Sequence, residues 1–367
     1  MTADERNLEP HDPRLRIDEE RCRANIKRLK QKADRHNLLF KPHFKTHQSA
    51  DIGSWFRQEG VTAITVSSVR MAEYFADAGW TDITLAFPVN VREAPRLSRL
   101  ARKIDLCLLI ADLRAIPMID NTLDHPVQAY IEIDTGSSRS GFYPGDTEEI
   151  GQAVAALGRS AHLSFRGFYS HPGHSYNADS VEKIDEIHRD ALGMMRSLKS
   201  RFSSDRLVPR VCQGDTPCCT LADDFDGMDE MSPGNIVFYD LMQYSLGVCK
   251  IDQIAVMLEA PVVAVYPNRS EAVVHGGAVH LSKESLNQQY GRLVDLKRSN
   301  NWQPVNGAYV KKISQEHGII HGPGEFIRRL TPGDIVGILP VHSCLTADLM
   351  AGYFDRNDTF INHMKAC

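Results

Sequence analysis

The sequence of 367 residues lacks any apolar run long enough to cross a bilayer, and its first residues, MTADERNLEPHDPRLR, are charged where a signal peptide needs an apolar segment. It also lacks an excess of positive charge, because 42 Lys and Arg face 47 Asp and Glu, for a formal net charge of -5. Phosphate backbones select concentrated positive charge. We therefore expect a cytoplasmic protein that binds neither nucleic acid nor a membrane.

Cysteine and nucleotide-binding glycine patterns are also scarce. The eight cysteines include no CxxC pair, which argues against a disulfide framework, a zinc ribbon or a redox pair. No GxGxxG or Walker loop stands at a strand-to-helix turn, and GPGEF lies among strand-like patterns. We expect reduced thiols and no dinucleotide-binding fold.

What the sequence does contain is an alternation of helix-like and short apolar segments from about residue 20. The helix pattern EERCRANIKRLKQKADRH is followed by runs such as VTAITVSS, DITLAFPV, DLCLLI and VQAYIEIDT. Alternation of this kind is typical of parallel βαβ units, and it predicts an α/β fold: a TIM-type (β/α)8 barrel over residues 20–255. Strand patterns joined by Gly, Pro and Asn then predict a C-terminal all-β domain over 256–367, to which residues 1–19 contribute.

Barrel enzymes work at the carboxyl ends of their strands, so residues that follow strands are the first candidates for chemistry. Lys45, in KPHFKTHQ, stands between His43 and His47 at the end of a short extended segment. A lysine there can form a Schiff base with an aldehyde cofactor if burial or neighbouring cations lower its pKa. Taken alone, a lysine flanked by histidines is more often a solvated loop residue.

Two glycine-containing turns also follow strand patterns. QGDTP contains Gly214, Asp215 and Thr216, and SPGNIVFYD contains Gly234 and Asn235. Unobstructed backbone N–H groups and small polar side chains are suited to a phosphate dianion. Taken in isolation, each segment is more often a simple turn than a phosphate-binding site.

A metal site is predicted at LPVHSCLTADLM. His342 and Cys344 are two residues apart on an expected strand, so both side chains would leave one face and converge on an ion. Imidazole and thiolate suit zinc better than magnesium or calcium, and a further ligand such as Asp348, water or substrate would complete the site. Without context, such a pair is more often part of a core.

Polar residues also gather after two other strand patterns. FYSHPGHSYN contains Tyr169, His171, His174 and Tyr176, which could hydrogen-bond a heteroaromatic ring and move protons, or could form an ordinary polar rim. Arg139, in DTGSSRSG, could bind a phenolic oxygen or a carboxylate.

Five segments, in order, resemble motifs of the fold-type III enzymes related to alanine racemase, most closely the branch of D-threonine aldolase and eukaryotic-type D-serine dehydratase. KPHFKTHQ resembles the segment whose lysine carries pyridoxal 5'-phosphate (PLP), IDTGSSRSG the DTGxxRxG segment, and QGDTP the phosphate-side loop. SPGNIVFYD resembles PGxYVFxD, and HSC the metal-binding pair. Gln48 and Asp215 depart from the family pattern, which has lysine and serine there.

The resemblance covers nearly the whole chain. It implies a homodimer with PLP and a divalent metal, zinc first and manganese or magnesium as alternatives. It also implies which residues serve the site. The catalytic residues would be Lys45, His342 and Cys344, the last two as metal ligands. The cofactor would be held by Lys45, Arg139, Tyr169, Tyr176, Gly214, Asp215, Thr216, Gly234 and Asn235.

The activity implied is that of a lyase acting on a small β-hydroxy D-amino acid such as D-serine or 3-hydroxyaspartate. If Lys45 removes the α-proton while the metal draws off the β-hydroxyl, a keto acid and ammonia result; if the hydroxyl proton is removed instead, glycine and an aldehyde result. Cys344 resembles the dehydratases, and Tyr176 and Asn177 stand where aldolases have a Gln-His pair. Dehydration is therefore favoured. D-threonine aldolase-type cleavage, an amino-acid racemase and a non-catalytic PLP-binding protein remain the alternatives.

Overall fold

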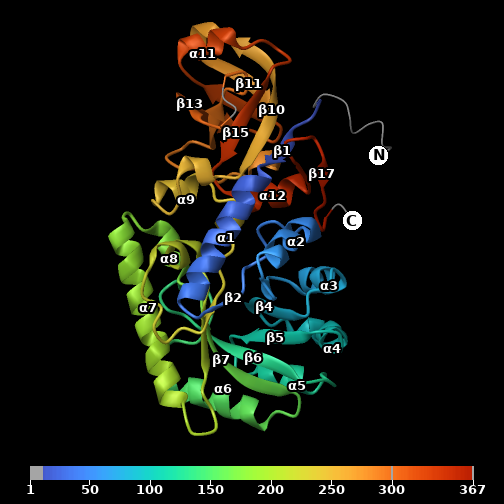
Figure 1. Cartoon of the computed structure of the whole chain (residues 1–367), viewed down its shortest axis with the longest axis vertical. Coiled ribbons are helices and arrows are strands. Elements are labelled where there is room, and N and C mark those ends of the chain that lie inside the picture. Colours follow the sequence, from blue (N-terminus) through green and yellow to red (C-terminus); the bar gives the residue numbers. More distant parts are fainter. Residues whose placement is uncertain (1–10, 299–300, 366–367) are drawn as a thin grey trace. The chain divides into compact units, whose positions relative to one another are not determined.

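The computed structural model describes residues 11–298 and 301–365 and divides the chain into two compact units (Figure 1). We call residues 27–45 and 53–234 the barrel unit, and residues 1–26, 46–52 and 235–367 the β-unit. Helices α1 (Glu19–Arg35) and α2 (Ala50–Gln58) continue from one unit into the other. The domain limits expected from the sequence, 20–255 and 256–367, stay a prediction.

The barrel unit contains a sheet of eight parallel strands in the order β2-β9-β8-β7-β6-β5-β4-β3. The strands are β2 (Leu39–Phe40), β3 (Ala63–Val66), β4 (Asp82–Pro88), β5 (Asp105–Ile110), β6 (Val127–Ile133), β7 (Leu163–Ser170), β8 (Arg210–Gln213) and β9 (Glu230–Met231). A parallel bridge between His43 and Thr65 joins the segment after β2 to β3 and closes the sheet. The predicted barrel and its apolar strands are confirmed.

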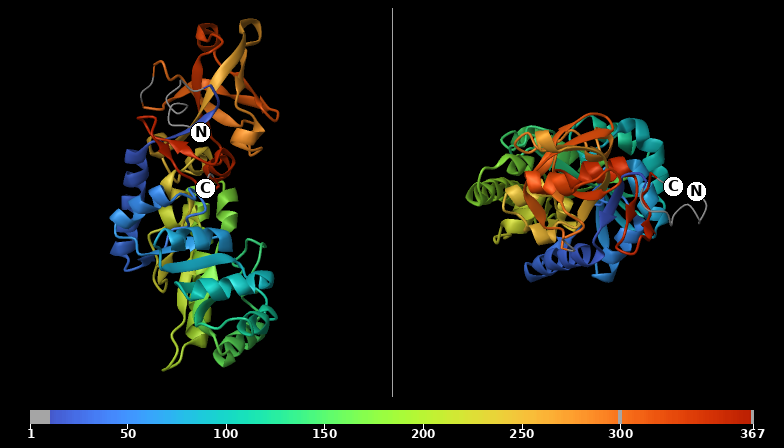
Figure 2. Two further views of the ribbon diagram at one scale, coloured as in Figure 1. Left: turned by 90° about the vertical axis from the view of Figure 1, so that its right-hand side faces the viewer. Right: turned by 90° about the horizontal axis from the view of Figure 1, so that it is seen from above.

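Helices follow most of these strands and lie outside them in Figures 1 and 2. They are α3 (Val69–Asp77), α4 (Ala94–Ala101), α5 (Ala115–Asp120), α6 (Thr147–Arg159), α7 (Val181–Phe202) and α8 (Thr216–Leu221). Several begin at a side chain that accepts a free N–H of the first turn, as Ser68, Asp146 and Ser180 do for α3, α6 and α7. These caps fix where each helix begins and therefore how the preceding loop leaves its strand.

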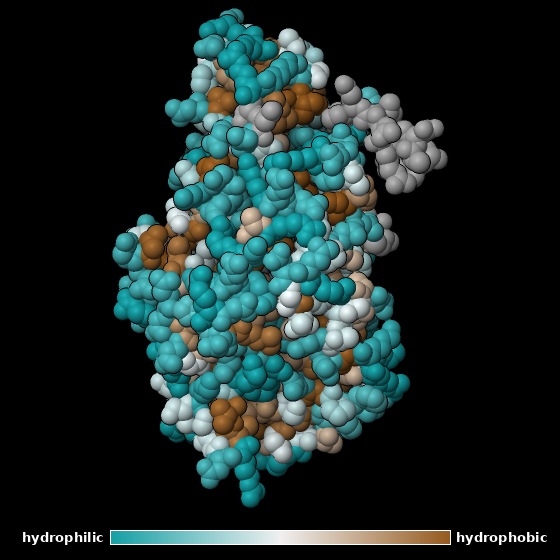
Figure 3. Space-filling view, in the orientation of Figure 1, coloured by the Kyte–Doolittle hydropathy of each residue, from teal (hydrophilic) through white to brown (hydrophobic). Residues whose placement is uncertain are grey.

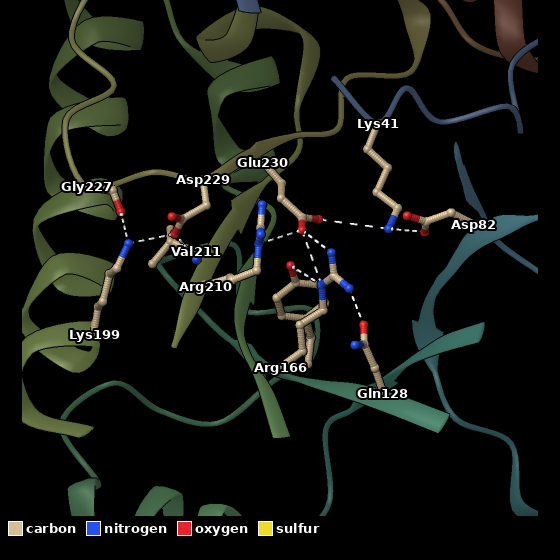
Figure 4. A network of polar contacts seen from close by, with 11 residues as sticks. Lys41, Asp82, Gln128, Arg166, Lys199, Arg210, Val211, Gly227, Asp229 and Glu230 are labelled. Carbon is tan, nitrogen blue, oxygen red and sulfur yellow. Dashed lines mark hydrogen bonds and ion pairs between the residues drawn. The ribbon is translucent and has the colours of Figure 1, made fainter. Parts of the chain in front are cut away.

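The amino-terminal ends of the barrel strands enclose a network of buried charges (Figure 4). Lys41 is fully buried, and its Nζ lies 2.7 Å from Asp82 Oδ1 and 4.0 Å from Glu230 Oε2. Glu230, also fully buried, is paired with Arg166 and with Arg210, at 3.0 Å for the second. Burial alone would raise the pKa of Glu230, but Lys41 and Arg166 outweigh it and lower that pKa.

Above this network, the barrel interior is filled by a small cluster of buried side chains: Cys107, Leu109, Tyr130, Tyr169 and Cys212. The Tyr130 hydroxyl accepts a hydrogen bond from Arg166 Nε at 2.9 Å, and the rings of Tyr130 and Tyr169 are 6.2 Å apart. The cluster therefore connects the charged network below with the carboxyl ends of the strands.

The β-unit is built on a nine-stranded sheet in the order β11-β14-β13-β12-β15-β10-β1-β16-β17. These strands are β1 (Arg14–Ile17), β10 (Val256–Tyr266), β11 (Glu271–His275), β12 (Gly291–Val294), β13 (Pro304–Ile313), β14 (His317–His321), β15 (Ile335–Pro340), β16 (Tyr353–Phe354) and β17 (Phe360–Ile361). β1 pairs antiparallel with β10, so Arg14 lies opposite Glu259. Its helices are α9 (Leu241–Ser245), α10 (Ala278–Leu281), α11 (Gly324–Arg329) and α12 (Ser343–Met350).

On the face shown in Figure 3, hydrophilic residues predominate and apolar ones are scattered. Within the described ranges, no helix combines the length and the hydropathy that crossing a bilayer requires.

Candidate active site

A pocket of about 310 Å³ lies within the barrel unit, among residues that end or follow strands. Its walls include Lys45 after β2, Phe87 at the end of β4, Arg139 after β6 and His171 after β7. The remaining lining residues are His43, Ser67, Ala86, Pro88, Ser140 and Tyr169. The pocket thus occupies the carboxyl ends of the strands, and it brings together four of the residues singled out from the sequence: Lys45, Arg139, Tyr169 and His171.

Phe44 determines which way the Lys45 segment faces. It is fully buried, and its ring is 4.9 Å from both Phe56 and Phe75 and 5.1 Å from Trp80. Residues 44–47 form a turn directly after the bridge that His43 makes to β3. In this turn Phe44 is directed into the aromatic cluster, while His43 and Lys45 on either side of it line the pocket.

A chain of hydroxyl groups underlies the pocket. Tyr169 is hydrogen-bonded to Ser232, whose Oγ donates to Thr65 Oγ1 at 2.8 Å, and Thr65 Oγ1 donates to the Lys41 carbonyl at 3.0 Å. Burial raises the pKa of Tyr169 well above its ordinary value, so the phenol stays neutral. The floor of the pocket is therefore tied to the backbone that leads to Lys45.

His171 is held neutral beside the pocket lysine. Its burial, followed by the positive charges of Arg139 and Lys45, lowers its pKa well below the ordinary value. Its Nδ1 is hydrogen-bonded to the Gly214 carbonyl, which can only accept, so the proton of the neutral ring is on Nδ1. Nε2 is left as a hydrogen-bond acceptor.

In the QGDTP turn, the backbone of Gly214 lies close to Ser232 and Tyr169. A Cβ atom on Gly214 would lie 2.6 Å from the Ser232 carbonyl and 2.9 Å from the Tyr169 hydroxyl, so only glycine fits. Asp215 does not leave a free charge there: its Oδ2 accepts from Cys218 N at 2.9 Å and from Ser175 Oγ at 2.8 Å, and caps α8. Burial raises the pKa of this carboxyl group.

Tyr176 and His174 lie beside these loops. The Tyr176 hydroxyl accepts a hydrogen bond from Thr216 N at 3.2 Å, whereas the resemblance implies a contact with the pyridine nitrogen. That implied role stays a prediction. A Cβ atom on Gly136 would lie 3.0 Å from the His174 ring, so His174 packs against the loop that carries Arg139.

Arg139 stands on a loop that Asp134 shapes. The Asp134 Oδ1 accepts from both Gly136 N and Ser138 N at 3.0 Å. Arg139 Nη2 lies 3.8 Å from Glu132 Oε1, and 54 % of the arginine side chain is exposed. The guanidinium is therefore held at the pocket wall by one long ion pair and is accessible to an anion.

In the β-unit, His342 and Cys344 lie at the start of a helix. The prediction that they share a strand is wrong, because β15 ends at Pro340 and His342 is the N-cap of α12. The helix begins here because Asp240 Oδ2 accepts from Ser343 N at 2.9 Å and Ser343 Oγ at 3.2 Å. The two side chains still converge, since they are hydrogen-bonded to each other.

The electrostatics of the pair follow from this contact. Burial lowers the pKa of His342, but the hydrogen bond and charge of Cys344 outweigh it and raise that pKa to about 9. An imidazole and a thiolate within hydrogen-bonding reach of each other are ligands that zinc accepts. Asp348, considered as a further ligand, is instead paired with Gln48 at 3.0 Å and with Lys365 at 2.6 Å.

The sequence did not reveal the surroundings of Cys344. Thr46, the residue after Lys45, places its Oγ1 3.3 Å from Cys344 Sγ. Asn235, expected at the phosphate, turns its side chain into the β-unit, where Nδ2 lies 3.6 Å from the same sulfur. Both residues belong to motifs quoted above, so the sequence marked them as candidates for the site. It did not indicate that their side chains point toward Cys344. Gly234 directly precedes Asn235 at the limit of the barrel unit.

A second group of metal-ligating type, His275, His280 and Glu316, is also found in the β-unit. Its candidate atoms lie within 4.8 Å of one another. However, the Gly277 N–H donates to His280 Nδ1 at 3.2 Å, so the neutral ring carries its proton on Nε2. In that tautomer His280 has no lone pair on Nε2 to offer to a metal, and the Nε2 atoms of His275 and His280 lie 3.4 and 3.9 Å from Glu316 Oε2.

An eight-stranded parallel barrel with a lysine in its pocket, continued by an antiparallel β-unit, is the architecture of the fold-type III PLP enzymes. The chain belongs to this class: residues 17–241 match the family described as alanine racemase, N-terminal domain. Residues 255–354 match the family described as putative serine dehydratase domain.

Individual relatives agree with this membership. The chain is 29 % identical to D-threo-3-hydroxyaspartate dehydratase of Delftia sp. (strain HT23), over 93 % of each chain, and 27 % identical to D-serine dehydratase of Dictyostelium discoideum, over 94 % of this chain and 93 % of the relative. It is 26 % identical to 3-hydroxy-D-aspartate aldolase of Paracoccus denitrificans (strain Pd 1222), over 62 % of this chain and 60 % of the relative.

The Delftia dehydratase has also been solved, and its structure superposes on this chain with a TM-score of 0.90, covering 98 % of each at 26 % identity. Two of its mutants have been solved too, one replacing a cysteine, in the metal-free form, and one replacing a histidine two positions earlier. The same spacing separates His342 from Cys344.

Proposed function

We propose that this protein is a PLP- and metal-dependent lyase that dehydrates a β-hydroxy D-amino acid to a keto acid and ammonia. The observation that carries the proposal is the position of Thr46. Its hydroxyl lies 3.3 Å from Cys344 Sγ, and its backbone is joined by one peptide bond to Lys45. Lys45, which lines the pocket, and Thr46, which contacts Cys344, are therefore consecutive residues with Cα atoms about 3.8 Å apart.

The residues of the barrel pocket fit PLP. Lys45 offers an amine in the wall, and Arg139 offers a partly exposed cation. When bound, PLP supplies an electron sink for charge at the substrate Cα, and the metal supplies a Lewis acid for a hydroxyl oxygen. Lys45 would hold PLP and, once released, take the α-proton of the substrate.

The neighbouring residues would prepare the proton transfer. His171 is neutral and cannot protonate the Lys45 amine, while its Nε2 can accept a proton or a hydrogen bond. Tyr169 stays neutral and holds the pocket floor through Ser232. His342 and Cys344 would hold the metal by one nitrogen and one sulfur, which leaves positions for the substrate oxygen and water.

Dehydration is favoured over aldol cleavage by the residues after β7. Tyr176 and Asn177 stand where the aldolases of the family have a Gln-His pair, and the Tyr176 hydroxyl is engaged with Thr216 N. Aldol cleavage needs a base that removes the β-hydroxyl proton, whereas dehydration needs a base for the α-proton, a role that Lys45 would fill, and departure of the β-hydroxyl as hydroxide. Aldolase activity is the second candidate, since an aldolase is among the relatives.

Product analysis tests the proposal. Purified protein loaded with PLP and zinc is incubated with D-serine, D-threonine and D-threo-3-hydroxyaspartate, and keto acid plus ammonia is measured against glycine plus aldehyde. Keto acid as the main product supports the dehydratase. Glycine as the main product would show that the protein is an aldolase, and formation of the L-isomer would show that it is a racemase. If PLP is bound but no substrate is turned over, the protein is a non-catalytic PLP-binding protein.

We also propose zinc as the metal, with manganese or magnesium as alternatives, a homodimer as the assembly and the cytoplasm as the location. Thiolate ligation supports zinc, because magnesium and manganese prefer oxygen. Elemental analysis of the purified protein identifies the metal. Analytical ultracentrifugation determines the assembly, and a monomer at working concentration would contradict it.

A further inference from the structure

Two hydrogen-bond donors are directed at the sulfur of Cys344. Thr46 is fully buried and places its hydroxyl 3.3 Å from Sγ, and Asn235 places its amide nitrogen 3.6 Å away. A metal-bound cysteine is a thiolate, which can accept hydrogen bonds but cannot donate them. The Thr46 hydroxyl must therefore donate to the sulfur when a metal is held there. The Asn235 amide, whose two hydrogens also face Asp240 and Ser343, adds a longer, shared contact.

The orientation of the Asn235 amide is fixed by its other partners. Nδ2 also lies 2.8 Å from Asp240 Oδ2 and 2.9 Å from Ser343 Oγ. A carboxylate oxygen can only accept, so the atom that faces Asp240 is the amide nitrogen. Asp240 is itself held, because its Oδ1 accepts from Gln243 N at 3.0 Å and caps α9.

We infer that Thr46 and Asn235 are positioning residues that hold the Cys344 thiolate for the metal, and that Thr46 links metal occupancy to the segment carrying Lys45. This inference rests on the proposed function. It reassigns the side chain of Asn235, which the resemblance places at the phosphate. Partners of a metal ligand typically contribute 10- to 100-fold in metal affinity, and two donors on one sulfur act in the same direction.

The link through Thr46 consists of one hydrogen bond and one peptide bond. The Thr46 side chain is bound to Cys344, which lies 298 residues further along the chain, while its backbone continues directly into Lys45. Filling the metal site fixes the sulfur and, through it, the Thr46 hydroxyl. If metal binding alters the environment of PLP on Lys45 through Thr46, PLP binding changes the metal affinity by the same factor, because coupling between two binding events is reciprocal.

The test uses the PLP-loaded protein and zinc. The zinc dissociation constant is measured by competition with a chromophoric chelator for wild type, Thr46→Val and Thr46→Ser. Valine keeps the shape and removes the hydroxyl, and serine keeps the hydroxyl. We expect about 10- to 100-fold weaker zinc binding for Thr46→Val and a value within about threefold of wild type for Thr46→Ser. Equal affinity of Thr46→Val and wild type would overturn the inference.

A second readout separates positioning from general structural support. Zinc is titrated into metal-depleted protein while the visible circular dichroism of bound PLP is followed. We expect a change that saturates with the zinc site in wild type and Thr46→Ser and that is lost in Thr46→Val at zinc saturation. Asn235→Leu should weaken zinc binding yet keep the response of the PLP circular dichroism to zinc. If Asn235→Leu does not fold, the comparison of Thr46→Val with Thr46→Ser tests the inference by itself.

His342→Ala distinguishes this inference from the proposed function. If His342→Ala keeps the wild-type zinc content and affinity, the metal is not at this pair and the proposed function fails. If His342→Ala loses zinc while Thr46→Val binds it as tightly as wild type, the proposed metal site stands and only the positioning role is lost.

Discussion

Two lysines only four positions apart show how differently the two ends of the barrel treat charge. The fully buried side chain of Lys41 reaches toward the amino-terminal end, where it pairs with Asp82 and faces Glu230, the first residues of β4 and β9. Lys45 lines the open pocket at the carboxyl end, beside a histidine that is kept neutral. The first end satisfies its charges within the protein, and the second leaves an amine and an arginine accessible to ligands.

The comparison explains why only one end is suited to chemistry. A buried charge whose partners are all present contributes to a unique fold and has little left to offer a substrate. At the carboxyl end the protein satisfies the supporting groups, Tyr169, Ser232 and Thr65, and leaves the reactive ones on the pocket wall. Four substitutions test this division.

The largest effect is expected from Lys45→Ala. Without the amine there is no covalent attachment of PLP and no base for the α-proton, so turnover should fall on the order of 10³-fold or more. The measurement is the visible absorption of bound PLP and its trapping by borohydride. A covalent PLP adduct that survives in Lys45→Ala would disprove the assignment, and Lys41→Arg is the control that should keep the adduct.

Cys344→Ala should act on the metal and leave PLP in place. Loss of the Lewis acid removes several kcal/mol of stabilisation from the departing hydroxide, so turnover should fall roughly 100- to 1,000-fold. Zinc content by mass spectrometry should fall while PLP absorption stays. If zinc content were unchanged, the His342/Cys344 pair would not be the metal site.

Glu230→Gln should affect stability and not chemistry. It removes the shared partner of Lys41, Arg166 and Arg210 and leaves their charges unbalanced at a buried position, which costs about 3 kcal/mol of unfolding free energy. The value is at the lower end of the usual range because 44 % of the Arg210 side chain is exposed. Urea unfolding measures it, with Glu73→Gln as the control.

The control pair, Glu73 with Arg96, has 38 % and 36 % of its side chains exposed, and its loss should cost no more than about 1 kcal/mol. Because the pKa of Glu230 is lowered in the folded state, its contribution is present above the unfolded pKa and is lost as pH falls through the folded value. Glu230→Gln should therefore show a weaker loss of stability in acid. Equal costs for Glu230→Gln and Glu73→Gln would break the comparison.

The smallest effect is expected from His171→Gln. The pKa of His171 is lowered well below its ordinary value in the folded state, so below pH 6.5 the unfolded chain takes up a proton that the folded protein does not. Stability should therefore fall by about 1 kcal/mol between pH 6.5 and 5.5 because of this residue. Urea unfolding at the two pH values should show that part of the loss disappearing in His171→Gln.

Local patterns were enough to predict the barrel, its long apolar strands and the pocket position of Lys45, because these depend on residues close in sequence. β2 and β9, of two residues each, carry no pattern and become visible only through their pairing. The start of α12 was missed because Asp240, 103 residues earlier, determines it. The side-chain direction of Asn235 depends on a contact with Ser343, 108 residues later.

The separation of residues 46–52 from the rest of the barrel sequence limits how this protein can be recombined. A chimaera that exchanges the β-unit at a single junction near residue 235 would pair a foreign helix α12 with the resident Thr46 and Gln48, which contact Cys344 and Asp348. In such a chimaera, residues 46–52 should be exchanged together with the carboxyl-terminal segment, because they belong to the same unit. The short stretch behind the lysine therefore belongs structurally with the β-unit and not with the barrel unit that contains the lysine.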